Sequence, residues 1–286
     1  MNFKQALETK KFVVTAELCP PKGVEVNALI AKAAPLKNLV EGINVTDNQR
    51  AVVRLSSLAF SKLLLDKGFD PIWQLTCRDR NLLAIQSDIL GAWALGIKNV
   101  LALSGDYPSK GDHPSARPVY DLDSVQLVDL INKMNFGKDF AGTDLIGHPD
   151  FFIGAVANPG ATPIEPQILK LRNKIDFGAK FIQTQVIYDI DIFKKFLQEL
   201  GNFPVKILAG IFPLTSYKTA VFLNTKVPGV SIPDKILKRI EKAKDPKKEG
   251  IAISIELIRE LKPLCSGIHL MTLNNIDVIP EILGEI

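Results

Sequence analysis

The sequence predicts an α/β protein that folds as a single (β/α)8 barrel, a TIM barrel with extra helices before its last strand, over residues 1–286. Its 286 residues are a typical length for one such barrel. Short apolar runs recur along the chain, and polar residues follow them. Glu17, Thr46, Thr76 and Asp106 follow the first four runs at intervals of about 30 residues, the length of one strand-plus-helix unit. Because the parallel strands of this fold end on one face, we expect these residues to mark the active face.

The first half of the chain is expected to hold four buried strands, because these apolar runs are too short for helices. We expect the strands at residues 13–16, 43–45, 72–75 and 100–104. Helices are expected between them, from about 27 to 39, from 53 to 67 and from 79 or 80 to 95. Gly68 and Gly96 follow the last two of these helices, as glycine C-caps commonly do.

The second half continues the alternation but contains two irregular segments. Residues 107–120 are polar, rich in Gly, Pro and Ser, and follow a strand, so we expect a functional loop on the active face. Residues 136–150 precede a strand and are expected to line the barrel floor. The remaining elements are expected as strands at 152–157, 180–185, 205–211 and 266–271, helices at 123–134 and 165–177, and two or three helices within 216–261. No linker or second domain is indicated.

The composition is that of an ordinary globular protein, with 47% hydrophobic and 23% charged residues and a net charge of +4. The one dense basic run, 242–248, is broken by Asp245 and Pro246, so we do not expect nucleic-acid binding. Three cysteines lie far apart, which favours a reducing compartment over disulfides or a zinc site. The sequence shows no apolar signal region or membrane span, so we expect a cytoplasmic protein without membrane contact.

Polar residues at the expected strand ends are the candidates for chemistry, because a barrel brings such positions to one face. They are Glu17, Thr46, Asp47, Thr76, Asp106, Asn158, Gln185, Asn274 and Asn275. The three histidines, at 113, 148 and 269, lie outside this set and are expected to be structural, so no metal site is predicted. The chain also lacks the glycine-rich nucleotide motifs and the GxSxG motif of hydrolases.

Glu17 and Asp106 are the two candidate carboxylates. Glu17 lies in an apolar run, where burial disfavours the ionised form and makes a carboxyl group suitable as a general acid. The alternative for Glu17 is a structural ion pair with a nearby Arg or Lys. Gln185 could equally be an amide whose hydrogen bonds are satisfied within its strand. The residues alone therefore indicate a barrel enzyme with acid chemistry and an amide-rich pocket.

Longer segments carry a resemblance to a known family. They are AELCPP at 16–21, VTDN at 45–48, QLTCRDRN at 74–81, GIKNVLALSGD at 96–106, KIDFGAKFIQTQ at 174–185, GIFP at 210–213 and IHLMTLN at 268–274. In this order they resemble the methylenetetrahydrofolate reductase family over nearly the whole chain. The resemblance implies a flavin-containing (β/α)8 barrel that reduces 5,10-methylenetetrahydrofolate to 5-methyltetrahydrofolate in one-carbon metabolism, serving methionine biosynthesis or the acetyl-CoA pathway.

The resemblance also implies residue roles. Glu17 would protonate N10 of the folate so that the five-membered ring opens, and hydride would pass from reduced flavin N5 to the exocyclic carbon. Asp106 would hold the pterin and tune the flavin, and Gln185 would hydrogen-bond the pterin. Leu223, Met271 and Asn275 complete the expected substrate site. The expected cofactor is FAD, with FMN as the alternative, contacted by Thr46, Asp47, Gln74, Leu103, Ser104, Gly105, Asp106, Ala157, Asn158, Thr162, Gln167 and Lys174.

The electron donor stays open at this point, because Leu223 stands where the family has a stacking aromatic residue. NADH or NADPH is one expectation, and ferredoxin or another electron-donating partner subunit is the other. The assembly is expected to be a homo-oligomer or a complex with such a subunit. Two further alternatives are a flavin-free, pterin-dependent methyltransferase barrel and a binding module without turnover. A pure binding module has no use for an acid at Glu17.

Overall fold

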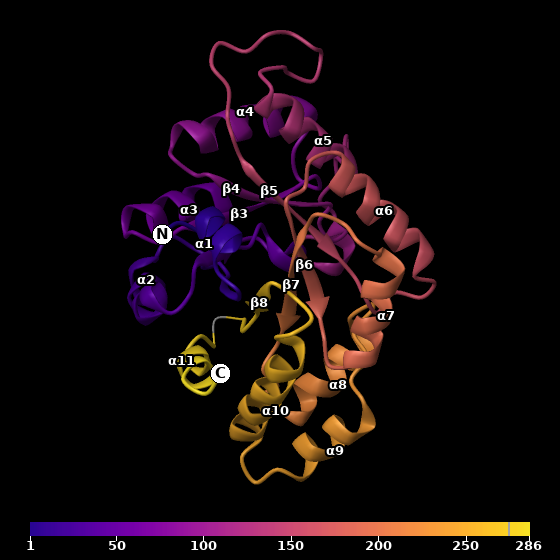
Figure 1. Cartoon of the computed structure of the whole chain (residues 1–286). Helices are drawn as coiled ribbons and strands as arrows, with labels where there is room; N and C mark the ends of the chain where they lie inside the picture. Colours follow the sequence, from indigo (N-terminus) through magenta and orange to yellow (C-terminus); the bar gives the residue numbers. More distant parts are fainter. Residues whose placement is uncertain (274) are drawn as a thin grey trace.

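The computed structural model describes residues 1–273 and 275–286 and shows a closed barrel of eight parallel strands in sequence order (Figure 1). β1 pairs with both β2 and β8, which closes the barrel. The strands are β1 (Val13–Leu18), β2 (Gly42–Val45), β3 (Pro71–Thr76), β4 (Asn99–Leu103), β5 (Phe152–Ala157), β6 (Phe181–Val186), β7 (Lys206–Ile211) and β8 (Gly267–Leu270). This architecture confirms the predicted fold class, and each strand overlaps its expected range.

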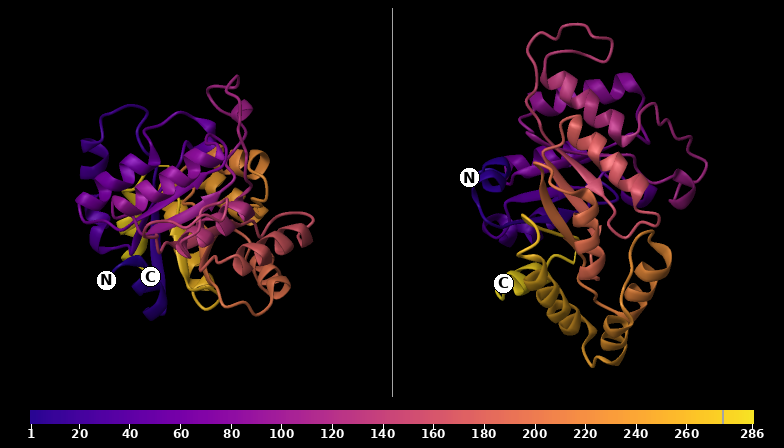
Figure 2. Two further views of the ribbon diagram at one scale, coloured as in Figure 1. Left: turned by 90° about the horizontal axis from the view of Figure 1, so that it is seen from above. Right: turned by 45° about the vertical axis from the view of Figure 1, so that its right-hand side comes forward.

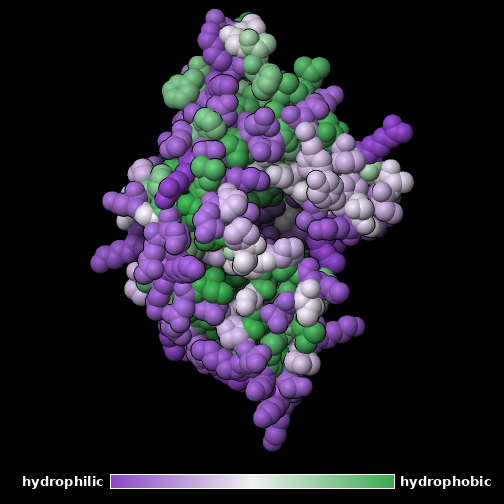
Figure 3. Space-filling model, turned by 90° about the vertical axis from the view of Figure 1, so that its right-hand side faces the viewer, coloured by the Kyte–Doolittle hydropathy of each residue, from purple (hydrophilic) through white to green (hydrophobic). Residues whose placement is uncertain are grey.

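Hydrophilic side chains cover much of the surface that Figure 3 shows. Helices surround the barrel, and most of them cover the outward faces of its strands, while one closes an end of the barrel. They are α1 (Phe3–Thr9), α2 (Asn27–Ala33), α3 (Ser57–Asp66), α4 (Leu82–Ala94), α5 (Ser124–Asn135), α6 (Glu165–Asp176), α7 (Ile190–Leu200), α8 (Tyr217–Lys226), α9 (Asp234–Lys242), α10 (Pro246–Leu261) and α11 (Val278–Leu283), with short 3-10 helices η1 (Ala34–Asn38), η2 (Gln49–Ala51) and η3 (Pro108–Lys110). Helices α8, α9 and α10 lie together at the lower end of Figure 1, where two or three helices were expected.

The helix expected from residue 53 begins later than the sequence suggested. α3 starts at Ser57, and the hydroxyl of its N-cap Ser56 accepts a hydrogen bond from the Ala59 amide at 3.4 Å. The preceding residues 49–51 form η2, in which Arg50 has a left-handed backbone. This local conformation cannot continue as an α-helix, so the apolar spacing overestimated the helix at its N-terminal end.

The lower interior of the barrel is apolar and is closed by α1, which the sequence analysis did not predict. Phe3 and Leu7 of α1 pack with Ile72, Phe152 and Phe181 of the strands in one buried cluster. The Phe3 ring lies 5.1 Å from that of Phe181 and 5.8 Å from that of Phe152, both edge-on. A capping box at Asn2 begins the helix. The short, charged N-terminal segment therefore supplies the plug of the barrel floor.

The expectation that residues 136–150 line this floor was wrong. Most of the segment is exposed, including Phe136, Phe140 and Ile146. Figures 1 and 2 show it as a loop projecting from the end of the molecule beyond α5. It precedes β5 as expected, but α1 already occupies the floor, so the segment is left in solvent.

None of the helices in the described part of the chain combines the length and the apolar character that a membrane span requires.

Candidate active site

The interior of the barrel becomes polar above the apolar floor. Side chains alternate between two faces along a strand, so the residues two places beyond the floor residues also point inward. This second layer contains the buried side chains of Thr15, Asn44, Gln74, Gln183 and His269. Glu17 and Thr46 stand one layer higher, and both are buried. The carboxyl ends of β1, β2, β3, β6 and β8 thus place polar groups around one interior space.

Glu17 is held between two groups that the sequence analysis did not pair with it. Nε2 of Gln49, in the loop after β2, donates a hydrogen bond to Oε1 at 3.1 Å. Nε2 of His269, on β8, lies 3.8 Å from Oε2. Over residues 1–273 and 275–286, no lysine or arginine forms an ion pair with this carboxylate. The alternative of a structural Arg or Lys pair at Glu17 is therefore not what the structure shows.

His269 belongs to this group, although its position inside a strand suggested a purely structural role. Its Nδ1 lies 3.0 Å from Oγ1 of Thr15 and 3.4 Å from Nδ2 of Asn44. The other ring nitrogen, Nε2, faces Glu17. Adjacent strands β1 and β8 place Thr15 directly beside His269 in register, which fixes the ring against Glu17.

Gln183 is a second residue that sequence reasoning missed. It is 3% exposed, yet neither its amide oxygen nor its amide nitrogen has a hydrogen-bond partner among the described residues. The Oδ1 atom of Asn44 is also without one. Buried polar groups are normally paired, so these atoms mark a place where water or a ligand can bind. The sequence feature that could have identified Gln183 is its polar side chain within the expected strand, two positions before Gln185.

Asp106 stands at the exposed edge of this space, after β4. Its backbone oxygen accepts a hydrogen bond from Arg78 at 3.3 Å, and its side chain is exposed. Gly105 has φ of +88°, and a Cβ there would come within 3.1 Å of Arg78 and Thr76 side-chain atoms. Only glycine fits this turn without strain. Leu103 and Ser104, which precede it, are half-buried at the same end of β4.

Asp47, expected to contact the cofactor, points away from the interior. Its carboxylate accepts hydrogen bonds from the Ser57 hydroxyl at 3.2 Å and from the Thr76 amide and hydroxyl at 3.0 and 2.8 Å. Arg80 adds donors at 2.7 and 3.3 Å. These contacts join β2, β3 and α3, so the geometry gives Asp47 a structural role. Its contact with a cofactor stays a prediction.

Lys174 and Asn158 lie at the β5 side of the mouth. Lys174 on α6 is buried, and its Nζ donates to the Val156 carbonyl at 3.0 Å. Burial lowers the pKa of its ammonium group to about 8. Asn158, after Ala157, donates to the Pro228 carbonyl at 3.2 Å, while its Oδ1 has no partner in the described part of the chain.

Gln185 lies at an irregularity of β6. The register between β6 and β7 shifts between Gln183 and Val186, which inserts one extra residue on β6. The Gln185 Oε1 atom accepts a hydrogen bond from the Val186 amide at 3.0 Å. The side chain is thus partly satisfied within its own strand, as its alternative interpretation proposed.

The other predicted site residues are not gathered around Glu17. Leu223 packs in the hydrophobic core, while its neighbour Phe222 is exposed. Asn275 lines a cavity of about 220 Å³ with Phe212 and Thr272, and Met271 lies half-buried before it. Thr162 is exposed and Gln167 is half-buried at the start of α6. Asn274, named among the strand-end residues, lies outside the described residues.

A family model described as "Methylenetetrahydrofolate reductase" matches residues 2–286. The chain belongs to this family. It is 32% identical over 222 residues to "Probable methylenetetrahydrofolate reductase (NADH)" of Oryza sativa subsp. japonica, covering 72% of this chain and 36% of that protein. It is 28% identical over 256 residues to "Probable methylenetetrahydrofolate reductase (NADPH)" of Caenorhabditis elegans, covering 84% and 35%. The chain thus spans about a third of the length of these methylenetetrahydrofolate reductases.

A solved structure supports the same fold. It is titled "Uncharacterized protein from Clostridium thermocellum binds two copies of 5-methyl-5,6,7,8-tetrahydrofolic acid" and superimposes with a TM-score of 0.66. Sequence identity is 17%, over 98% of this chain and 95% of that one. At this identity the likeness concerns the barrel fold, which methylenetetrahydrofolate reductases share with barrels of other activities.

The site suits the flavin on which methylenetetrahydrofolate reductases generally depend. A flavin offers ring edges with hydrogen-bond donors and acceptors, and one or more phosphates. The unpaired amide groups of Gln183 and Asn44 can meet such an edge, and the buried ammonium of Lys174 can meet an anion. The glycine turn at Gly105 allows a ligand to approach the backbone closely.

Within the part of the chain that the structure describes, no cluster of three or more His, Cys, Asp or Glu could hold a metal ion.

Proposed function

We propose that this protein reduces 5,10-methylenetetrahydrofolate to 5-methyltetrahydrofolate, with a bound flavin as hydride carrier and Glu17 as general acid. The observation that carries the proposal is Glu17 itself. It is a 5% exposed carboxyl group at the end of β1, held by neutral Gln49 and facing His269, without a lysine or arginine partner among the described residues. A buried carboxyl group beside a bound substrate is a side chain of the kind that serves as a general acid.

The folate has to lose its bond between the methylene carbon and N10. Glu17 supplies the proton to N10, so that this bond breaks and the carbon remains attached to N5 as an iminium. A reduced flavin held in the site would supply the hydride that makes this carbon a methyl group. Glu17 then regains its proton from solvent. Asp106, exposed at the same mouth, is proposed to hold the pterin together with Gln185.

The proposed flavin site lies on the β3, β4 and β5 side of the barrel. Gln74, Leu103, Ser104 and Gly105, at the ends of β3 and β4, would hold its ring. Lys174 would attract a phosphate. FAD is the proposed flavin, with FMN as the alternative, because both carry the same ring and at least one phosphate.

The first test is spectroscopic. Purified protein should be yellow or become yellow with FAD or FMN, and the released flavin identifies the cofactor. Anaerobic mixing with NADH, NADPH or reduced ferredoxin should then bleach the flavin with one donor. Bleaching by a nicotinamide supports a reductase that works alone, and bleaching by ferredoxin only supports a partner-dependent enzyme. A colourless protein that neither flavin reconstitutes would contradict the proposal and favour a flavin-free methyltransferase.

Glu17→Gln should leave flavin reduction intact and slow reoxidation of the reduced enzyme by methylenetetrahydrofolate by a factor on the order of 10² or more. The amide keeps the shape of the side chain but has no acidic proton to give. Stopped-flow measurement of flavin absorbance separates the two half-reactions. The exposed Glu25→Gln is the matched control and should react at the wild-type rate. An unimpaired folate half-reaction in Glu17→Gln would refute the acid role.

A further inference from the structure

The segment 48–51 is the most unusual backbone of the mouth. Asn48, Arg50 and Ala51 have φ of 45°, 60° and 55°, so three of its four residues adopt the left-handed region without being glycine. Residues with a Cβ rarely adopt this region, and strain of this kind persists only where the surroundings enforce it. The fourth residue is Gln49, which donates the hydrogen bond to Glu17.

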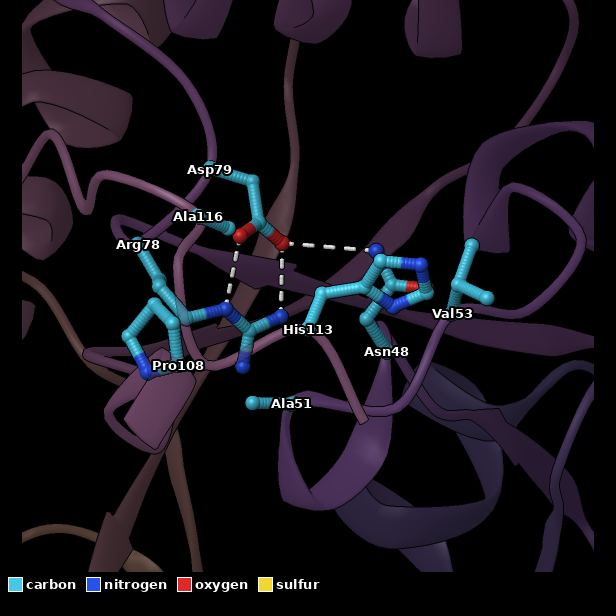
Figure 4. A pocket seen from close by; sticks show the side chains of 8 residues that line it. All are labelled: Asn48, Ala51, Val53, Arg78, Asp79, Pro108, His113 and Ala116. Carbon is cyan, nitrogen blue, oxygen red and sulfur yellow. Dashed lines mark hydrogen bonds and ion pairs between the residues drawn. The ribbon is translucent and has the colours of Figure 1, made fainter. Parts of the chain in front are cut away.

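Several contacts hold the segment in this conformation. The Asn48 amide donates to Asp79 at 3.3 Å and its carbonyl oxygen Oδ1 accepts from the Arg54 backbone at 2.9 Å. Asp79 is itself bound by Arg78 through two hydrogen bonds, as Figure 4 shows. Ala51 lies so close to the loop after β4 that a Cβ on Gly111 would come within 1.8 Å of its carbonyl oxygen. The segment is thus fixed on the side of β3 and β4.

A contact on the opposite side crosses the mouth. The guanidinium of Arg50 lies 5.3 Å from the centre of the Phe222 ring, on α8. α8 follows β7, whereas Arg50 follows β2, so this cation–π contact joins loops from distant parts of the barrel rim. Arg50 and Phe222 are both exposed, so the contact lies at the surface.

The segment also borders free space. A cavity of about 230 Å³ lies between it and the loop after β4, lined by Asn48, Ala51, Val53, Pro108 and His113 among others (Figure 4). The backbone on both sides of Gln49 is therefore strained, and the segment 48–51 borders an open cavity. This combination is typical of a segment whose conformation serves the adjacent site.

We infer that Gln49 is a positioning residue for Glu17, and that the Arg50–Phe222 contact keeps the strained segment closed over the mouth. The inference rests on the proposed function, because it assigns Gln49 a role in proton transfer. Gln49 Nε2 donates a hydrogen bond to Oε1 of Glu17, which leaves Oε2 as the oxygen that would pass a proton to N10. Without this hydrogen bond the carboxyl group can rotate, and the proton is no longer held toward N10.

The test combines two substitutions in the flavin-loaded protein. Gln49→Met keeps the length of the side chain but removes the donor. We expect it to slow the folate half-reaction about 10-fold or more, while flavin and folate affinities stay at wild-type values. In a Glu17→Gln background the same substitution should cause no additional slowing, because Gln49 acts through Glu17. Gln198→Met, at an exposed position of α7, is the matched control and should match the wild type.

Two outcomes would overturn the assignment of Gln49. One is a wild-type rate in Gln49→Met, and the other is equal slowing with and without Glu17. Failure of the proposed function looks different, because the wild-type protein would then show no folate half-reaction at all.

The closing contact has a test that needs no turnover. Trypsin cleaves after arginine, so cleavage after Arg50 reports how often the segment opens. Phe222→Leu should speed this cleavage. Phe136→Leu, at the exposed end of α5, is the control and should not change the cleavage rate. Equal cleavage rates in wild type and Phe222→Leu would refute the closing role of the Arg50–Phe222 contact.

Discussion

The surroundings of Glu17 come from residues far away in the chain. A carboxyl group at a strand end is common, but here one oxygen accepts a hydrogen bond from the Gln49 amide and the other lies 3.8 Å from the imidazole of His269. Neither neighbour follows from a local pattern in the sequence. Gln49 belongs to the loop after β2, and His269 lies on β8, which is adjacent to β1 only in the closed barrel.

Gln183 offers a test of whether its unpaired amide serves a ligand. In the ligand-free protein, Gln183→Met removes a buried polar group without a partner, so we expect the free energy of unfolding to rise by about 1–3 kcal/mol. Flavin or folate affinity should fall in the same variant, because the amide is lost. Urea unfolding and flavin titration measure the two effects. A less stable variant with unchanged affinities would show that the amide is satisfied inside the protein.

Lys174 predicts a pH dependence of flavin binding. Burial lowers the pKa of its ammonium to about 8 in the free protein, and a bound phosphate favours the charged form. Flavin affinity should therefore be constant below pH 8 and decrease as the pH rises above it, because the free protein loses the charge that attracts the phosphate. Fluorescence titration between pH 7 and pH 9.5 measures this. Lys174→Met should bind more weakly and lose this dependence, and a wild-type slope in the variant would contradict the assignment.

At the scale of elements, α1 is a short helix with a large structural role. Seven residues close the floor of the barrel through Phe3, Ala6 and Leu7, which are all buried. Phe3 alone contacts the rings of Phe152 and Phe181. The helix is too short to be stable by itself, so its packing against the strands stabilises it.

Phe3→Ala should lower the free energy of unfolding by about 3–5 kcal/mol, because it leaves a cavity among aromatic rings under the barrel. The expected cause is lost packing, so the m-value of urea unfolding should stay the same. Phe136→Ala is the matched control, since Phe136 is 79% exposed and should change stability by less than about 0.5 kcal/mol. Equal effects of the two substitutions would show that α1 does not close the floor.

At the scale of the whole molecule, closure of the barrel turns eight separate strand ends into one site. The apolar floor sealed by α1 excludes water from below, and the polar layer above it faces the mouth. The long loop at 107–120 and the segment 48–51 then meet at the rim, beside the cavity of Figure 4. The candidate site residues and the apolar floor residues therefore lie at opposite ends of one barrel interior.

Much of this arrangement was predictable from local patterns. The repeat of apolar runs and polar residues about 30 residues apart predicted the strands, their common face and the candidates Glu17 and Asp106. Hydrophobic periodicity and glycine stops predicted most helices, since both reflect short-range physics. The same patterns failed at α1 and at residues 136–150, because nothing local shows which segment fills the floor.

The sequence by itself determined the barrel, its polar face and the family to which the chain belongs, because strand burial, turn chemistry and specific segments are properties of neighbouring residues. Only the tertiary structure decided which side chains share the interior. It turned Asp47 outward to Arg80 and brought Gln49 and His269 to Glu17. The physical reason is that strand register and closure set these distances, and both depend on contacts between residues far apart in the chain.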